Sequence, residues 1–191
     1  MPIINHVNTI PSTGKEVRGL TVMDDLFVLR QGVKHIGVYD VNTYALKRNM
    51  ETSSYYYSLQ NHSVIGISSC SANKCLYVVS NDCNAVLCIN PTSGAMPNRW
   101  SIANPPDGIS VNPVSKNVVV TCLNVHNLYE YTPAGVLVRT VSLQAQAAGP
   151  RHAIQLTSGQ LLVCHGDANA FSRVCLLEED GQKVVNFAGS W

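Results

Sequence analysis

A short opening motif recurs four times along the chain at intervals of about 40 to 50 residues, and this repeat constrains the fold more than any other feature. Aligned on these openings, Gly19, Gly66, Gly108 and Ala153 are equivalent. The chain is therefore expected to consist of four similar units. The four openings are Arg18-Gly19-Leu20-Thr21-Val22, Ile65-Gly66-Ile67-Ser68, Asp107-Gly108-Ile109-Ser110-Val111 and His152-Ala153-Ile154-Gln155-Leu156.

Each unit continues with apolar runs that are too short for helices. These runs are rich in β-branched and aromatic residues and are bounded by turn-forming residues, which is typical of strands. A glycine turn such as Thr132-Pro133-Ala134-Gly135 then leads into a fourth run, and each unit is predicted to form four antiparallel strands. The second runs are Leu26–Leu29, Leu76–Val79, Val118–Val120 and Leu161–Val163, and the third are Ile36–Tyr39, Ala85–Ile89, Leu128–Tyr131 and Val174–Leu177.

A four-stranded unit repeated at this spacing is typical of a β-propeller blade, so we expect an all-β propeller with about four blades. Residues 1–15 form an N-terminal segment that could supply a closing strand, and the blades cover about 16–61, 62–104, 105–149 and 150–191. A β-sandwich would also give short strands, but it would not repeat the opening, the second strand and the glycine turn in one order. The best helical stretch, Ser142–Ala148, falls between two blades and is expected to be a linker.

Composition and charge restrict the function classes. The 191 residues are 46% hydrophobic and 13% charged, which indicates a folded chain. The formal net charge is +1, so no basic excess favours nucleic acid or membrane surfaces. The chain has no apparent secretory signal and no apolar stretch of the roughly 20 residues that span a bilayer.

The seven cysteines bear on the cellular compartment. Their number is odd and several lie in apolar strand runs, which favours a reducing, cytoplasmic setting. Cys70 and Cys75 are close enough in sequence to bridge a hairpin, and Asn61-His62-Ser63 matches a glycosylation acceptor, so a secreted origin stays open.

The series of motifs resembles the NHL repeat. Asp107–Val111 and Pro150–Ile154 match its opening, Val79–Val86 resembles its Ala-Asp-x-x-Asn-x-Arg-Val segment, and Val184–Gly189 resembles its blade-ending strand and Phe-Gly-Gly. Over roughly Glu16 to Trp191, the chain is most similar to the C-terminal propellers of invertebrate tripartite-motif (TRIM-NHL) proteins. The resemblance implies a six-bladed propeller, of which about four blades are present here, and a loop face that recognises a protein or peptide.

The chain departs from this family in two respects. The arginine that the family often has before the third strand is replaced by Ala85, Asn127 and Ser172. No Cys-x-x-Cys pair occurs, so nothing in this chain corresponds to the zinc modules of a ubiquitin ligase, and whether such a module lies upstream stays open. An incomplete ring would also leave an apolar face and a sheet edge uncovered at each end, which predicts self-association.

Polar residues gather in the loops of one predicted propeller face, and these are the candidate partner-binding residues. Converging polar side chains on loops can bind a peptide or a small polar ligand, although Asn and Asp also serve to stabilise turns. The loops between second and third strands hold Lys34, His35, Asn81, Asp82, Asn124, His126, Asp167 and Asn169, and the loops that lead into blades hold His62, Asp107, Arg151 and His152.

We expect a non-enzymatic interaction module without a cofactor, a metal or a catalytic residue. One alternative is a metal-centred propeller lyase or hydrolase, because His62 and His152 both precede blades; no ligand position repeats, however, and a catalytic metal usually needs three protein ligands. Cys164 precedes His165, but strand neighbours point to opposite faces, so Cys164 is expected in the core. A third alternative is RNA binding, for which lysine and arginine are sparse.

Overall fold

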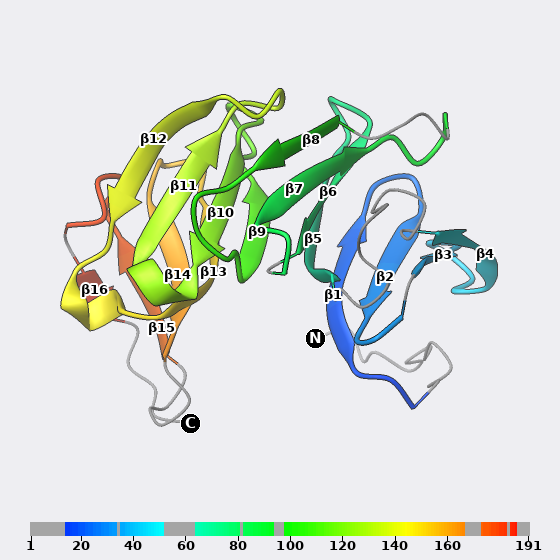
Figure 1. Ribbon diagram of the computed structural model, residues 1–191, viewed down its shortest axis with the longest axis horizontal. Coiled ribbons are helices and arrows are strands. Elements are labelled where there is room, and N and C mark those ends of the chain that lie inside the picture. Colours follow the sequence, from blue (N-terminus) through cyan, green and yellow to red (C-terminus); the bar gives the residue numbers. More distant parts are fainter. Residues whose placement is uncertain are drawn as a thin grey trace, which may run out of the picture.

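The computed structural model confirms an all-β fold of four antiparallel sheets, each with four strands, and almost no helix (Figure 1). It describes residues 14–33, 35–51, 64–80, 82–93, 98–166, 173–182 and 184–186. Blade 1 comprises β1 (Val17–Val22), β2 (Leu26–Arg30), β3 (His35–Tyr39) and β4 (Leu46–Glu51); blade 2 comprises β5 (Val64–Cys70), β6 (Cys75–Ser80), β7 (Ala85–Ile89) and β8 (Asn98–Ser101); blade 3 comprises β9 (Gly108–Val111), β10 (Val118–Cys122), β11 (Asn127–Tyr131) and β12 (Leu137–Ser142); blade 4 comprises β13 (Pro150–Gln155), β14 (Leu161–His165), β15 (Arg173–Leu177) and β16 (Val184–Asn186).

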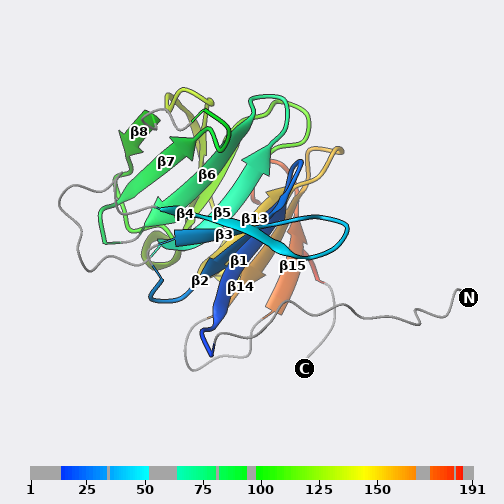
Figure 2. The same ribbon diagram turned by 90° about the vertical axis from the view of Figure 1, so that its right-hand side faces the viewer.

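The strands of each blade pair in chain order, so that the first strand is innermost and the fourth is outermost. Contacts between blades run from β1 to β5, from β5 to β9 and from β9 to β13. The blades therefore follow one another along an arc, with blade 1 at one end and blade 4 at the other (Figures 1 and 2).

The core lies between consecutive blades because the central strands are apolar on both sides. In β6, Val78 packs with residues of blade 1, whereas Tyr77 and Val79 pack with residues of blade 3. We call the side of a blade that is turned toward the preceding blade its backward face, and the opposite side its forward face. Each internal interface joins a forward face to a backward face, which explains why the central strands β6 and β10 of the two inner blades are buried on both sides.

Strand pairing corrects the alignment of the fourth repeat by one residue. Gly108 is opposite Thr121, and both belong to the forward face of blade 3. In blade 4, Ala153 is opposite Val163 and both pack backward against blade 3, so Ala153 is equivalent to Ile109 rather than to Gly108. His152 therefore occupies the position that is glycine in the first three blades. Blades 1 and 2 have the same bulge before their glycine, at Val17/Gly19 and Val64/Gly66, so the bulge between Pro150 and His152 is shared and does not cause the shift. The sequence alignment had matched Ala153 to glycine because it is the small residue of the fourth opening.

Other expectations have mixed outcomes. Ser142 ends β12, and the rest of the predicted linker up to Ala148 lies between blades 3 and 4, where it forms the short 3₁₀ helix η3 (Ala145–Ala147). Cys70 and Cys75 are directly opposite in the β5–β6 hairpin, yet both are free thiols. In the described part of the chain, no helix is long and apolar enough to cross a lipid bilayer. Residues 1–13, where a closing strand was predicted, lie outside the described residues.

Candidate functional site

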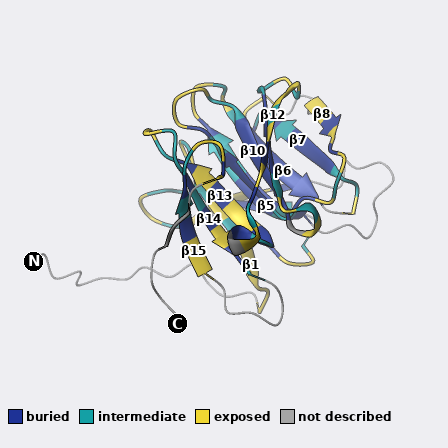
Figure 3. Cartoon of the chain, turned by 90° about the vertical axis from the view of Figure 1, so that its left-hand side faces the viewer, coloured by how far each residue is buried: buried dark blue, intermediate teal, exposed yellow. Residues whose placement is uncertain are grey.

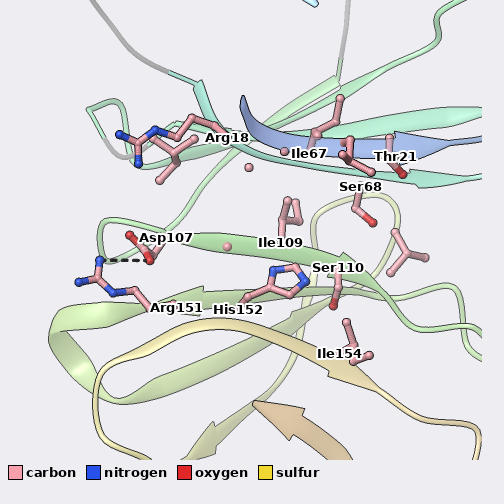
Figure 4. A pocket seen from close by; sticks show the side chains of 16 residues that line it. Arg18, Thr21, Ile67, Ser68, Asp107, Ile109, Ser110, Arg151, His152 and Ile154 are labelled. Atoms are coloured by element: carbon pink, nitrogen blue, oxygen red, sulfur yellow. Dashed lines mark ion pairs between the residues drawn. The ribbon is translucent and has the colours of Figure 1, made fainter. Parts of the chain in front are cut away.

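The four innermost strands line a central channel with a cavity of about 480 Å³. Each of β1, β5, β9 and β13 contributes its opening motif to the wall, so the repeat itself builds the channel. Figure 4 shows charged side chains at one end of the cavity, Ile67, Ile109 and His152 in the middle, and hydroxyl groups together with Ile154 toward the other end. The channel is thus the place where polar groups from separate blades converge, which is what a ligand site requires.

Arg18, Asp107 and Arg151 form the charged rim of the channel. Strand pairing puts them at one repeat position, immediately before the glycine position, where blade 2 has Ile65. A guanidinium nitrogen of Arg151 lies 3.6 Å from a carboxylate oxygen of Asp107, and Arg18 pairs with Glu16 at 3.1 Å. The rim is therefore a set of loosely held opposite charges that a ligand can reach.

The local environment shifts the charge equilibrium of Asp107. Burial raises the pKa of its carboxyl group, while the nearby Arg151 and Arg18 act in the opposite direction. The Asp107 amide donates to the Thr121 carbonyl oxygen at 2.8 Å, which fixes the backbone at the start of β9. The carboxylate is thus positioned by its strand and only partly compensated by its neighbours, so it retains capacity for another donor.

His152 projects into the channel because it takes the glycine position of blade 4 (Figure 4). Its side chain is exposed to the channel, yet the surrounding protein atoms lower its pKa by desolvation. A histidine with a pKa below its ordinary 6.5 is neutral at pH 7 and can both donate and accept a hydrogen bond.

The prediction that Cys164 belongs to the core is wrong. Cys164 is exposed on the forward face of blade 4, whereas its neighbour His165 is buried. The two do point to opposite faces, as expected from strand geometry. Cys164 is instead directly opposite His152, a juxtaposition that depends on strand register.

Hydroxyl groups form a second polar level of the channel at Thr21, Ser68 and Ser110. These residues are equivalent in the first three blades, two positions after the glycine. Thr21 Oγ1 shares a hydrogen bond of 2.8 Å with Ser69 Oγ. The Ser110 hydroxyl is buried and has no hydrogen-bond partner in the described structure, so it leaves unused hydrogen-bonding capacity beside the cavity.

The loops between second and third strands hold the remaining described candidates. Asn124 lies in the short 3₁₀ helix η2 (Leu123–Val125), and its side chain is exposed. His126 has a left-handed backbone, and its Nδ1 accepts a hydrogen bond of 2.9 Å from the Gly149 amide, which ties this loop to the start of blade 4. His126 is exposed, and it also stabilises the position of this loop.

The two other described candidates, His35 and Asp82, do not line the channel. His35 begins β3 and is half-buried opposite Glu51, and Asp82 is exposed in the turn before β7. Among the predicted residues that the structure describes, Asp107, Arg151 and His152 line the channel. Sequence analysis missed Arg18 and Ser110 as site residues, although both lie in repeated opening motifs. Lys34, His62, Asn81, Asp167 and Asn169 lie outside the described residues.

The described residues contain no group of three or more His, Cys, Asp or Glu side chains that could hold a metal ion. The half-buried Cys88 of blade 2 and the buried Cys122 of blade 3 are also poor nucleophiles, because desolvation raises the pKa of each thiol to about 12. The accessible chemistry of the channel is therefore that of charged, imidazole and hydroxyl groups.

Solved structures with this architecture are β-propellers. The chain aligns with hydrazine synthase of Kuenenia stuttgartiensis at 14% identity and a TM-score of 0.69, covering 97% of this chain and 52% of that one. It aligns with virginiamycin B lyase of Staphylococcus aureus at 16% identity and a TM-score of 0.66, covering 91% of this chain and 55% of that one. It aligns with the WD40 repeats of RRP9 at 12% identity and a TM-score of 0.70, covering 94% of this chain and 53% of that one. No protein-family model and no curated protein matches the chain significantly. The chain is a β-propeller structure that spans about half the length of these neighbours.

Proposed function

We propose that this chain is a non-enzymatic, NHL-like interaction module that binds a protein or peptide segment at the charged rim of its channel. The observation that carries the proposal is the convergence of Arg18, Asp107, Arg151 and His152 from three blades on one opening. Arg151 and Asp107, whose charged atoms are 3.6 Å apart, can form ion pairs with charged groups of a peptide. The neutral imidazole of His152 can form hydrogen bonds with its amide groups.

The loops around this rim support the same proposal. Asn124 is exposed, and the hydrogen bond from Gly149 to His126 positions its loop beside the start of blade 4. Polar loops held by a rigid sheet scaffold are a common arrangement for recognition. The WD40 repeats of RRP9 have the same architecture, at an identity that relates the folds alone.

Arg151→Glu is expected to weaken peptide binding at the rim. The probe is a phage-displayed library of random peptides, selected on the wild-type chain. Because the variant places two carboxylates together at the rim, selected peptides should bind at least about tenfold more weakly, which corresponds to roughly 1.4 kcal/mol. Dissociation constants are measured by isothermal titration calorimetry.

Arg99→Glu is the matched control. Arg99 is exposed on the outermost strand β8, and its substitution changes the net charge by the same amount. Equal loss of binding in both variants would show a charge effect without a site at the rim. Failure of the wild-type chain to enrich any peptide would contradict the proposal directly.

An enzyme of the lyase type is the second candidate function. The neutral His152 favours it, since an imidazole in a channel could accept a proton. Virginiamycin B lyase of Staphylococcus aureus shares the propeller architecture, and one of its solved structures is a catalytically inactive histidine-to-alanine variant with quinupristin. An RNA-binding propeller has less support, because the net charge of +1 gives no basic surplus.

Metal analysis distinguishes the interaction module from a metal-centred enzyme. We expect purified chain to contain less than stoichiometric divalent metal by plasma mass spectrometry, since the described residues offer no group of three ligands. One bound ion per chain that disappears in His152→Ala would overturn the interaction module in favour of the enzyme.

A further inference from the structure

The inner end of the channel carries hydroxyl groups. Thr21, Ser68 and Ser110 line the cavity there, at equivalent positions of blades 1, 2 and 3. Among the described residues that line the cavity, the charged ones are those of the rim, and Figure 4 shows them at the opposite end. A charged group inserted to the inner end would therefore lose its hydration without meeting an opposite charge.

The hydrogen bonds of Thr21 leave its hydroxyl oxygen able only to accept. Ser69 Oγ donates its single proton to the Val22 carbonyl oxygen at 2.8 Å. In the 2.8 Å contact between Thr21 Oγ1 and Ser69 Oγ, the proton must then come from Thr21. Thr21 has no second hydroxyl proton, so a ligand group that bonds to its oxygen has to be a donor.

Ser110 keeps its hydroxyl proton available. Its side chain lines the cavity and is 5% exposed, and its hydroxyl has no hydrogen-bond partner among the described residues. A buried hydroxyl without a partner costs free energy, which a ligand that bonds to it recovers. Thr21 and Ser110 together therefore suit a neutral ligand group that both donates and accepts, such as a hydroxyl or a primary amide.

The wall between the rim and the hydroxyl groups is largely apolar. Asp107 and Ser110 are three residues apart in extended chain, which separates the two levels by about 10 Å. Figure 4 shows Ile67 and Ile109 between these levels, together with the ring of His152. Among uncharged polar side chains, tyrosine carries its hydrogen-bonding group farthest from the backbone, and it does so behind an apolar ring.

The cavity has space and access for such a side chain. Its volume of about 480 Å³ falls within the roughly 300–1,000 Å³ that is typical of ligand pockets. Figure 3 shows exposed residues along β1 and β13, two of the innermost strands that line the cavity. The channel is therefore open to solvent along these strands.

We propose that the peptide segment bound at the rim inserts a tyrosine side chain into the channel, with its ring against the isoleucines and its hydroxyl group at Thr21 and Ser110. The phenol donates to the Thr21 oxygen and accepts from the Ser110 hydroxyl. Phenylalanine would leave both groups unpaired, and the amide of glutamine does not extend as far from the backbone. The inference rests on the proposed peptide site and names the residue that the site recognises.

Binding of p-cresol, which is the side chain of tyrosine alone, tests the inner site separately from the rim. Saturation-transfer NMR titrations of the 191-residue chain compare it with toluene, which lacks the hydroxyl group, and with propionamide, which lacks the ring. We expect p-cresol to bind about two- to tenfold more tightly than toluene, the range that a hydrogen bond contributes. Equal or tighter binding of toluene or of propionamide would overturn the proposal.

Two substitutions locate the bound p-cresol. Ser110→Ala and Thr21→Val each remove one hydroxyl group without a change of charge, and each should weaken p-cresol binding about two- to tenfold while leaving toluene binding unchanged. Since the Ser110 hydroxyl is buried without a partner, its removal should not lower the unfolding free energy, so weaker binding is not a loss of fold. Thr140→Val is the matched control, because Thr140 is exposed on the outermost strand β12. An affinity for p-cresol that neither variant changes would overturn the proposal.

Peptides separate this inference from the proposed function. Those selected on the wild-type chain are expected to share a tyrosine, and replacing it with phenylalanine should weaken binding more in the wild-type chain than in Ser110→Ala. Enriched peptides without tyrosine would overturn the inference and leave the rim site standing. Binding of p-cresol without enrichment of any peptide would support the inner site and contradict the proposed function.

Discussion

Gly108→Ala is expected to destabilise the fold strongly, although alanine is the smallest possible side chain. A Cβ atom at Gly108 would meet the carbonyl oxygen of Arg151, and would lie 2.8 Å from Thr121 Oγ1 and 3.0 Å from His152 Nδ1. The first of these is backbone of the next innermost strand, which cannot rotate away. Overpacking of this kind typically lowers the free energy of unfolding by about 1–3 kcal/mol.

The same substitution would disturb the joint between blades 3 and 4. Thr121 Oγ1 donates a hydrogen bond of 3.0 Å to the Arg151 carbonyl oxygen, across the space that the new methyl group would enter. Loss of this bond would move Arg151 away from Asp107, so peptide binding at the rim should weaken together with stability. Urea denaturation at low protein concentration measures the change in unfolding free energy.

Gly19→Ala is the control for Gly108→Ala, because Gly19 has the equivalent position in blade 1. Its Cβ atom would lie 3.0 Å from the Cγ2 of Ile67, a side-chain end that can shift by a rotation. The control should therefore lower the unfolding free energy less. Equal losses in the two variants would show that close approach of β13 to β9 is not what requires glycine at position 108.

The propeller was predictable because the same apolar runs return in the same order, and the structure confirms four blades of four strands. The charged rim was predictable only in part. Asp107 and Arg151 stood out as polar residues before an apolar strand, but their pairing depends on how β13 packs against β9. Gly108 allows β13 to approach β9 closely. The spacing of residues in the sequence does not predict this contact.

The limits of sequence reasoning are clearest in blade 4. Similarity of the opening motifs aligned Ala153 with Gly108, whereas strand pairing gives that position to His152. An alignment that is wrong by one residue assigns every side chain of a strand to the opposite face. Strand pairing places His152 in the channel wall and Cys164 opposite it on the exposed forward face, whereas the sequence alignment had left His152 among the loop residues.

Ile67→Ala is expected to lower the unfolding free energy by about 2–5 kcal/mol, as for other large-to-small changes in cores. Ile67 is buried between blades 1 and 2, where its Cγ2 covers Gly19 and its neighbours include Leu29 and Val78. Truncation would leave a cavity at the innermost part of the interface, where the backbones of β1 and β5 are already in close contact and cannot collapse far. Urea denaturation again gives the measurement.

Leu20→Ala is the comparison that isolates the effect of the preceding blade. Leu20 has the repeat position of Ile67 but is 63% exposed, so the substitution should change the unfolding free energy of the single chain by no more than about 0.5 kcal/mol. In repeat architectures, stability is approximately the sum of each unit and its interfaces with neighbours. Similar losses at positions 20 and 67 would mean that this position stabilises the blade itself, whereas the expected difference assigns its contribution to the interface with the blade before it.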